Sequence, residues 1–507
     1  MLKKYNMVFK VSAAIMLVLV VFGVIWPDAL EQTTSSIKTL IADTLGWYYL
    51  IVVTLFLLVC LSFLVTPLGR IKLGKRDDKP EFSRPTWIAM LFSAGMGIGL
   101  VFWGTAEPIS HYAVSSPTGE TGTEQAIKDA MRFTYFHWGI HAWAIYGIVA
   151  LVLAYFNFRH EQPGLISATL KPLIGEKAAK GAFGQVIDIL AVIATVIGVA
   201  TTLGFGAVQI NGGLSYLFDL PSGILVQFII IAVVTVLFMI SAWSGLGKGI
   251  KILSNANMGL ASLLFLLVFI LGPTMFILNL FTNSIGTYVQ NLPMMSFRIA
   301  PLNAETRDWI DAWTLFYWAW WIAWSPFVGV FIARVSRGRT IREFVFTVLI
   351  VPSIIGFLWF STFGGTAIDM EHSGLRMISE LAAEESLFGV FENLPLSWIA
   401  SITAMTLVAT FFITSADSGT FVLGMMTTGG SETPGTSIKL TWGVLLSATA
   451  VALLYTGGLQ ALQNTMIIAA LPFSIIMLLM VISFIKAIYK EGRELGVGRF
   501  NPPHKDK

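Results

Sequence analysis

The sequence predicts an all-α membrane protein with 12 transmembrane helices, on the basis of its composition, its apolar runs and its charge distribution. Of its 507 residues, 55% are hydrophobic and 12% are charged, a composition too apolar for a soluble protein. Twelve runs are long enough to cross a bilayer. With the N-terminus inside, 26 of the 32 Lys and Arg residues lie in inner segments, so the positive-inside rule places both termini in the cytoplasm.

The twelve runs leave little chain for a soluble domain. The first run follows Lys3, Lys4 and Lys10. A cleavable signal peptide is the alternative, but no small-residue cleavage site follows, so we expect a retained span. The only cysteine, Cys60, excludes an intrachain disulfide. The predicted spans are 11–27, 47–66, 86–113, 134–155, 187–209, 222–242, 255–279, 310–333, 344–366, 397–424, 439–457 and 464–488.

Two outer connections are expected to form structure of their own. Residues 367–395 are acidic and favour an amphipathic external helix. Residues 283–303 favour an interfacial segment broken by Pro293 and Pro301. The net charge of +3 indicates no nucleic-acid partner.

The third span contains the alternating glycines Gly95, Gly97 and Gly99. Glycines at this spacing weaken a helix, and a break deep in a membrane is tolerated only beside protein or a water-filled cavity. Interrupted helices of this kind bind substrates and Na⁺ in secondary transporters. The alternative is close helix packing through small residues.

The eighth span is the richest in tryptophan, with six of the 16 tryptophans between Trp309 and Trp324. Five aromatic residues share one helical face at spacings i, i+4, i+7, i+8 and i+11: Trp313, Tyr317, Trp320, Trp321 and Trp324. An interfacial belt explains Trp309 and Trp313. The arginines from Arg334 onward mark the cytoplasmic end, so the last three tryptophans lie near mid-depth, where an aromatic cage for a cation without hydrogen-bond donors is favoured.

The fourth span, with FHWGIHAWAIYG, offers a second aromatic wall in Trp138, Trp143 and Tyr146. His137 and His141 have a metal-ligand spacing, but no third ligand accompanies them, so packing or hydrogen bonding is favoured.

The tenth span, with FFITSADSGTFVLG, brings the hydroxyls of Thr414, Ser415 and Ser418. Intramembrane polar groups indicate function by default, and these oxygens suit a hard cation beside the carbonyls of the third span. The alternative is interhelical hydrogen bonding. For Asp417, pairing or hydrogen bonding is favoured over ion ligation.

Spans three to seven and eight to twelve form two blocks of five, and an odd number makes their topologies inverted. Each block opens with an expected interruption, GMGIG in one and WSPFVG in the other. The predicted divisions are 1–85 with two accessory helices, 86–282 as the first repeat, 283–308 as the interfacial segment, 309–489 as the second repeat, and 490–507 as a short cytoplasmic tail.

The segments DAWTLFYWAWWIAWSPFVGVFIARVSRGR, AGMGIG, FHWGIHAWAIY and FFITSADS closely resemble the betaine/choline/carnitine transporter family over nearly the whole chain. The resemblance implies a LeuT-like fold, a homotrimer in a bacterial plasma membrane, and Na⁺-coupled uptake of a trimethylammonium compound, without any other cofactor.

The resemblance also implies site residues. The substrate cage would be formed by Trp138, Trp143, Tyr146, Trp320, Trp321 and Trp324, with Phe102 closing the pathway. One sodium site would use Ala94, Met96, Phe411, Thr414 and Ser415. A second would use Thr195, Tyr146 and Phe327, but Val199 stands where another hydroxyl is expected, so one or two sodium ions remain alternatives.

Gly99 bears on the cargo, because choline-type relatives tend to carry an acidic group there. Glycine favours a zwitterion such as glycine betaine, used for osmoprotection, with choline, carnitine, ectoine and proline betaine as alternatives. A channel or osmosensor is a distant alternative because no repeated polar rings are present. An enzyme is not expected, because no nucleophile, metal or cofactor motif stands out.

Overall fold

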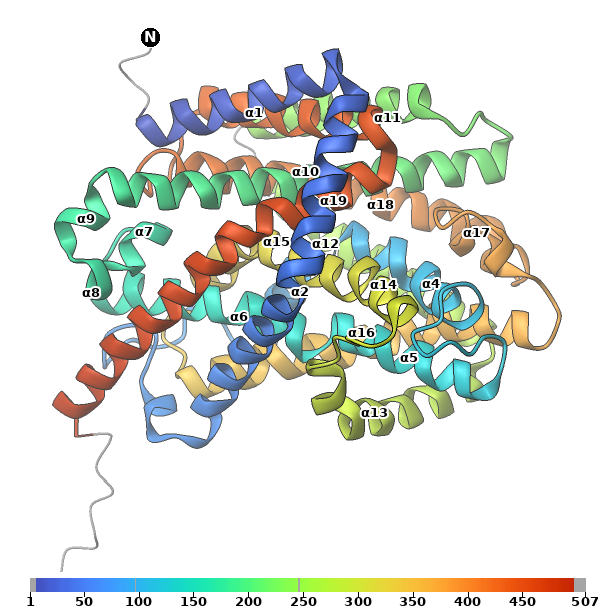
Figure 1. The fold of residues 1–507 in the computed structure, drawn as a ribbon, viewed down its shortest axis with the longest axis horizontal. Helices are drawn as coiled ribbons and strands as arrows, with labels where there is room; N and C mark the ends of the chain where they lie inside the picture. Colours follow the sequence, from blue (N-terminus) through green and yellow to red (C-terminus); the bar gives the residue numbers. More distant parts are fainter. Residues whose placement is uncertain (1–5, 96, 245–246, 497–507) are drawn as a thin grey trace, which may run out of the picture.

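The fold is described from a computed structural model covering residues 6–95, 97–244 and 247–496. In these ranges the regular elements are helical, apart from one antiparallel bridge between Lys72 and Thr340. Ten helical segments of this part of the chain are long and apolar enough to cross a membrane. The all-helical membrane prediction is therefore confirmed, and Figure 1 shows long helices stacked in several directions.

Helices match the predicted spans of the first half of the chain, except that the predicted span 255–279 runs past the end of α12 at Leu271, because Gly272 and Pro273 break the chain before α13. Two of them exceed the predicted length, since α2 and α10 extend by several turns. The elements are α1 (Met7–Ile25), α2 (Pro27–Val65), η2 (Pro67–Arg70), α3 (Arg84–Gly95), α4 (Ile98–Ala113), α5 (Glu124–Trp138), α6 (Ile140–Ala154), the π-helical turn η3 (Tyr155–Arg159), α7 (Ile166–Thr169), α8 (Lys171–Ile174), α9 (Glu176–Lys180), α10 (Ala182–Phe218), α11 (Ile224–Ser244) and α12 (Gly247–Leu271).

The second half of the chain continues with fewer and longer helices. The elements are α13 (Thr274–Ser296), α14 (Ala304–Ala312), α15 (Thr314–Val335), α16 (Ile341–His372), η4 (Ile378–Glu380), α17 (Ser386–Glu392), α18 (Ser397–Met426) and α19 (Thr436–Glu494). The predicted eleventh and twelfth spans are the two arms of α19, which bends at Gly457 and Gly458.

The third span is interrupted at the glycines, as predicted. Helix α3 ends at Gly95 and α4 begins at Ile98, with Gly97 in an extended conformation between them. A second interruption was not predicted: Gly139 separates α5 from α6 in the fourth span. Both breaks bring non-helical backbone into the predicted membrane interior, where it must be covered by protein.

The predicted interruption at WSPFVG is wrong. Helix α15 runs through Pro326 without a break. Proline removes the backbone donor for the Ile322 carbonyl, and the Ser325 hydroxyl donates to that carbonyl instead, at 2.8 Å. The neighbouring serine thus satisfies the group that proline leaves unpaired. The chain instead changes helix at Trp313, between α14 and α15.

The predicted outer segments also need correction. Residues 367–395 do not form one helix: α16 continues to His372, and only the short η4 and α17 follow. Helix α13 is a separate element that begins after Pro273 and includes Pro293. Pro293 lies in the last turn of α13, so one lost backbone hydrogen bond does not divide the helix.

Helices of the first half of the chain pack mainly against helices of the second half. Helix α4 packs on α16 and α6 packs on α15, while α10 packs on α19 and α12 on α18. Each of these pairs joins one predicted repeat to the other. In Figure 1, α1 runs alongside α10, and α2 crosses the molecule at a steep angle against α19.

The bend of α19 predicts that a side chain at Gly458 would strain the backbone. Gly458 has φ +59° and ψ −140°, a conformation that is strained for a residue with a side chain. We expect Gly458→Ala to destabilise the protein by about 1–3 kcal/mol, measured as a lower melting temperature in detergent. A Cβ at Gly458 meets no atom within 4 Å, so the effect would come from the backbone alone.

Gly356→Ala is the matched control, because a Cβ there also meets nothing within 4 Å but the residue is helical in α16. We expect this variant to be neutral or stabilised by up to about 1 kcal/mol. Equal melting temperatures for the two variants would contradict the strain at Gly458.

Candidate functional site

The aromatic face of α15 forms one continuous stack of rings. Trp320 and Trp321 lie 4.9 Å apart between ring centroids at an interplanar angle of 11°. Tyr317 stacks on both of them, at 6.1 Å on Trp320 and 5.8 Å on Trp321. All three are buried. The helical spacing in the sequence therefore correctly predicted a shared face for these three rings, whereas the Trp324 ring packs on Phe327.

The fourth span supplies the second wall, as predicted. Trp138, the last residue of α5, meets Trp321 edge to face at 4.9 Å. Tyr146 on α6 meets the same ring at 5.8 Å, and Trp143 meets Tyr146 at 5.8 Å. Because Gly139 ends α5 directly after Trp138, the two helices place their aromatic residues around one tryptophan of α15.

Four of the five cage tryptophans turn their N–H groups toward fixed acceptors. A buried indole N–H needs such a partner, and the aromatic faces are left for contacts with other apolar or cationic groups. The four donations are Trp138 to Glu107 Oε2 at 2.7 Å, Trp320 to Thr202 Oγ1 at 3.3 Å, Trp321 to the His137 carbonyl at 2.9 Å and Trp324 to the Gly198 carbonyl at 2.8 Å.

Gly99 lies against this cage. A Cβ at Gly99 would come within 2.5 Å of Trp320 Cη2 and 3.4 Å of Trp138 Cη2. A Cβ at Gly97 would meet only Trp324 Cη2, at 4.0 Å. The glycine at 99 is therefore required for the close approach of α4 to two cage tryptophans.

Phe102, predicted to close the pathway, is buried one turn further along α4. Its ring lies 5.5 Å from Phe205 and 4.9 Å from Trp103. Phe205 in turn lies 5.2 Å from Trp320. Phe102 thus reaches the cage through Phe205, and its gating role stays a prediction.

The prediction that Trp309 belongs to an interfacial belt is wrong. Trp309 is buried within the protein, and its N–H donates to the Ser115 carbonyl at 2.9 Å. Its ring lies 5.1 Å from His111. Trp313 donates to Ser115 Oγ at 3.2 Å. Short helix α14 turns both tryptophans inward, which a single straight span would not do.

The residues of the first predicted sodium site come from the helices expected to supply them. Phe411, Thr414 and Ser415 lie on α18, and Ala94 lies in the last turn of α3. Met96 lies outside the described residues. The Thr414 hydroxyl accepts from Asn257 Nδ2 at 3.1 Å. Ion binding at these residues stays a prediction.

The second predicted sodium site also stays a prediction. The Thr195 hydroxyl donates to the Ala191 carbonyl of its own helix at 2.8 Å. Phe327 packs edge to face on Trp324 at 5.4 Å, and Tyr146 belongs to the aromatic cage. Val199, which stands where a second hydroxyl ligand was expected, is buried beside Gly419 of α18. Its side chain offers no oxygen to an ion.

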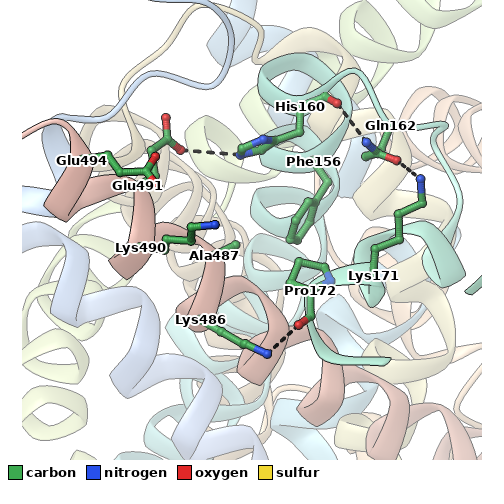
Figure 2. A pocket seen from close by; sticks show the side chains of 10 residues that line it. All are labelled: Phe156, His160, Gln162, Lys171, Pro172, Lys486, Ala487, Lys490, Glu491 and Glu494. Carbon is green, nitrogen blue, oxygen red and sulfur yellow. Dashed lines mark hydrogen bonds and ion pairs between the residues drawn. The ribbon is translucent and has the colours of Figure 1, made fainter. Parts of the chain in front are cut away.

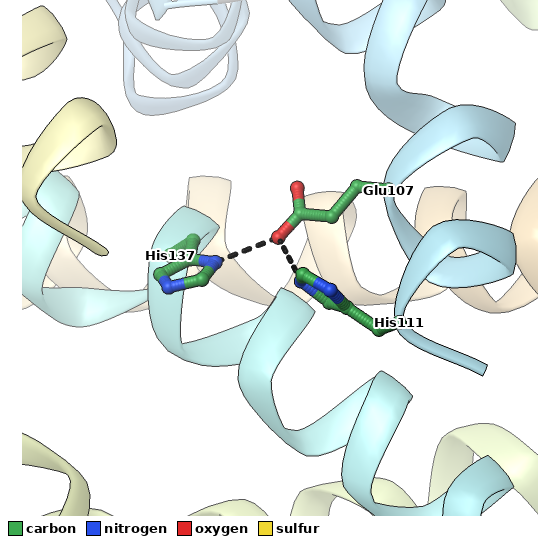
Figure 3. Close-up of side chains that lie close together, drawn as sticks. All are labelled: Glu107, His111 and His137. Atoms are coloured by element: carbon green, nitrogen blue, oxygen red, sulfur yellow. Dashed lines mark hydrogen bonds and ion pairs between the residues drawn. The ribbon is translucent and has the colours of Figure 1, made fainter. Parts of the chain in front are cut away.

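A buried polar cluster behind the cage, centred on Glu107, was not predicted from the sequence. Glu107 and His111 lie one turn apart on α4, and His137 lies opposite on α5 (Figure 3). Glu107 Oε1 is 2.7 Å from His137 Nδ1 and 3.3 Å from His111 Nε2. The i, i+4 spacing of Glu107 and His111 was the available signal.

These three side chains fit a hydrogen-bonded cluster better than a metal site. Their ligand atoms lie within 4.8 Å of one another. Two ligands of one tetrahedral zinc ion lie about 3.3 Å apart, whereas Glu107 Oε1 and His137 Nδ1 are at hydrogen-bond distance. The prediction that His137 and His141 hydrogen-bond is confirmed, since His141 Nε2 lies 3.0 Å from Ser296 Oγ.

Figure 2 shows a separate pocket with a volume of about 480 Å³ near the end of α19. It is lined by three lysines and two glutamates, and none of the cage aromatics lines it. Glu491 is held there by Arg159 and by the Tyr155 hydroxyl. Its mixed charges do not suit the burial of a trimethylammonium group.

A helical membrane bundle with an interrupted helix beside an aromatic cage is typical of a secondary transporter. The chain belongs to the betaine/carnitine/choline transporter family, whose family model matches residues 7–493. It is therefore a transporter that lies in a lipid bilayer, and not an enzyme.

Three relatives illustrate the range of the family. The chain is 59% identical to the glycine betaine transporter OpuD of Bacillus subtilis, over 98% of this chain and 96% of the relative. It is 45% identical to an ectoine/hydroxyectoine transporter of Virgibacillus pantothenticus, over 96% and 97%. It is 43% identical to a probable glycine betaine transporter of Desulfitobacterium hafniense, over 96% and 98%.

The contact between Gly99 and Trp320 predicts a sensitive position. Gly99→Ala would place a methyl group 2.5 Å from Trp320 Cη2, so the ring or α4 must move. We expect the KM for transport of a quaternary ammonium substrate to rise about tenfold, because a displaced ring loses contacts worth about 0.5–2 kcal/mol. Gly97→Ala is the matched control, since its methyl group meets Trp324 only at 4.0 Å. Equal KM values for the two variants would contradict this.

Proposed function

We propose that the protein takes up glycine betaine into the cell by symport with sodium. The observation that carries the proposal is the buried cage, in which Trp138, Tyr146, Trp320 and Trp321 bring their aromatic rings together from α5, α6 and α15. A trimethylammonium group has no hydrogen-bond donors, so it binds aromatic faces without leaving donors unpaired.

Selectivity follows from the same physical argument. Each cation–π contact is worth about 0.5–2 kcal/mol. An ordinary ammonium ion would lose hydrogen bonds to water on entering the cage, whereas betaine has none to lose at its cationic end. The cage therefore favours quaternary ammonium groups partly because ordinary ammonium ions lose hydrogen bonds when they enter it.

The surroundings of Gly99 favour a zwitterionic cargo. Its nearest neighbours are the rings of Trp320 and Trp138, and no acidic side chain occupies this position. A cargo with its own carboxylate needs no acid from the protein there and would be repelled by one. The similarity to OpuD supports glycine betaine, while the similarity to an ectoine/hydroxyectoine transporter keeps ectoine as the second candidate.

Sodium coupling is supported by the placement of polar oxygens beside the interrupted third span. Ile98, at the start of α4, and Phe412, on α18, both border Gly206 of α10. The first turn of α4 and the Thr414 segment of α18 therefore lie near each other. The membrane potential would supply about 2.3 kcal/mol per charge per 100 mV, which allows steep accumulation against a gradient.

The architecture proposed for this function is a 12-span, LeuT-like arrangement of two inverted repeats with cytoplasmic termini. The exchange of packing partners between α4–α16 and α6–α15 supports the repeat, because an inverted symmetry maps one pair onto the other. The bend of α19 at Gly457 and Gly458 supports two spans in that helix. A homotrimer and a role in osmoprotection complete the proposal.

Uptake of labelled glycine betaine into proteoliposomes tests the proposal. We expect uptake to require an inward sodium gradient, and Trp321→Leu to reduce the apparent affinity at least tenfold, because it removes the ring at the centre of the cage. Trp398→Leu is the control, since Trp398 is 55% exposed. Equal uptake without sodium would exclude symport, and stronger competition by ectoine would reassign the cargo.

The sodium site has its own test. Thr414→Ala removes one hydroxyl ligand, so we expect the sodium concentration for half-maximal uptake to rise about tenfold, or about 1.4 kcal/mol. Thr410→Ala is the control one turn earlier, where the hydroxyl donates only to its own helix at Thr406 and Leu407. An unchanged sodium dependence in Thr414→Ala would place the ion elsewhere.

A further inference from the structure

A fully buried carboxylate, that of Glu107, contacts the cage at Trp138, and Figure 3 shows it between His111 and His137. Glu107 Oε2 accepts hydrogen bonds from Trp138 Nε1 at 2.7 Å and from the Tyr317 hydroxyl at 2.5 Å. Its Oε1 lies 2.7 Å from His137 Nδ1 and 3.3 Å from His111 Nε2. Groups from α4, α5 and α15 therefore meet on one carboxyl group.

The two hydrogen bonds to Oε2 suit an ionised Glu107, because both come from donor groups. The indole N–H of Trp138 can only donate, so no proton on Oε2 can be directed toward it. The Tyr317 hydroxyl also donates its proton to Oε2. His137 Nε2 lies 3.0 Å from the Thr314 hydroxyl. If that hydroxyl donates, the His137 proton lies on Nδ1, facing Oε1.

The carboxylate is connected to both walls of the cage. It binds Trp138 directly, and the carbonyl of His137 accepts from Trp321 Nε1 at 2.9 Å. Tyr317, its other donor, stacks on Trp321 at 5.8 Å. The N–H edge of Trp138 faces Glu107, while its ring packs against Trp321 at 4.9 Å. Glu107 therefore acts on the cage through the Trp138 and Tyr317 rings that it hydrogen-bonds, and not by touching a cargo.

We propose that Glu107 is a positioning residue whose negative charge also strengthens the cage for quaternary ammonium groups by polarising the Trp138 indole. An N–H that donates to a carboxylate releases electron density into its ring. A ring with a more negative face attracts a cation more strongly. This inference rests on the proposed cargo site and explains why an acid is present near the cage although Gly99 carries none.

The test compares glycine betaine with 3,3-dimethylbutanoate, its carbon isostere, in which an uncharged tert-butyl group replaces the trimethylammonium group. Dissociation constants for both are measured by calorimetry on the purified full chain. Glu107→Gln keeps the shape and the acceptor for Trp138 and Tyr317 but removes the charge. We expect it to lower the preference for betaine over the isostere about tenfold.

Two further variants separate charge from shape. Glu107→Asp keeps the charge with a shorter reach, and we expect it to retain the preference within about twofold even where both ligands bind more weakly. Glu371→Gln is the matched control. Glu371, at the end of α16, is also buried, but it accepts hydrogen bonds from Ser379 and not from a cage residue. We expect this variant to bind both ligands as the unmodified protein does.

The outcomes are distinct. If Glu107→Gln weakens both ligands equally, or leaves the betaine dissociation constant within twofold of the unmodified protein, the charge has no role and the inference is overturned. If Glu107→Gln does not fold, a tenfold loss of preference in Glu107→Asp, which keeps the charge, overturns it instead. If the unmodified protein binds no glycine betaine, the proposed function itself fails, whatever the variants do.

Discussion

The geometry of the cage depends on where the indole N–H groups find acceptors. Burying an indole N–H without a partner is costly in a membrane protein, and an acceptor, where there is one, fixes the plane of the ring. Here three acceptors are the Glu107 carboxylate and the backbone carbonyls of His137 and Gly198. Because the donors point to these groups, the aromatic faces rather than the polar edges are available to a cation.

Two of these acceptors come from places where helices approach closely or stop. Gly198 lies on α10, where a Cβ would come within 2.8 Å of Trp324 Cδ1, so the carbonyl is reachable only because the side chain is absent. The His137 carbonyl lies two residues before the break at Gly139, where backbone hydrogen bonding within the helix ends. Close packing and helix interruption thus supply the polar groups that a continuous apolar helix would keep to itself.

Features that follow from local sequence could be predicted, and those that depend on distant partners could not. The aromatic face of α15 and the break at Gly97 follow from spacing and from glycine chemistry. The expected break at Pro326 failed because Ser325 repairs the lost hydrogen bond, a repair that depends on side-chain rotamer. The belt assignment of Trp309 failed because α14 is a separate short helix, and its angle to α15 is set by tertiary packing.

The pairing of Glu107 with His137 shows the same limit at the functional site. The two residues are 30 positions apart and lie on different helices, so nothing in local spacing joins them. A buried carboxylate is costly in a membrane unless it is paired. Four side chains meet on Glu107, and the donors of Trp138 and Tyr317 would lose their acceptor if the carboxylate were removed. The same requirement for hydrogen-bond partners that orients the cage tryptophans therefore also fixes the charge behind them.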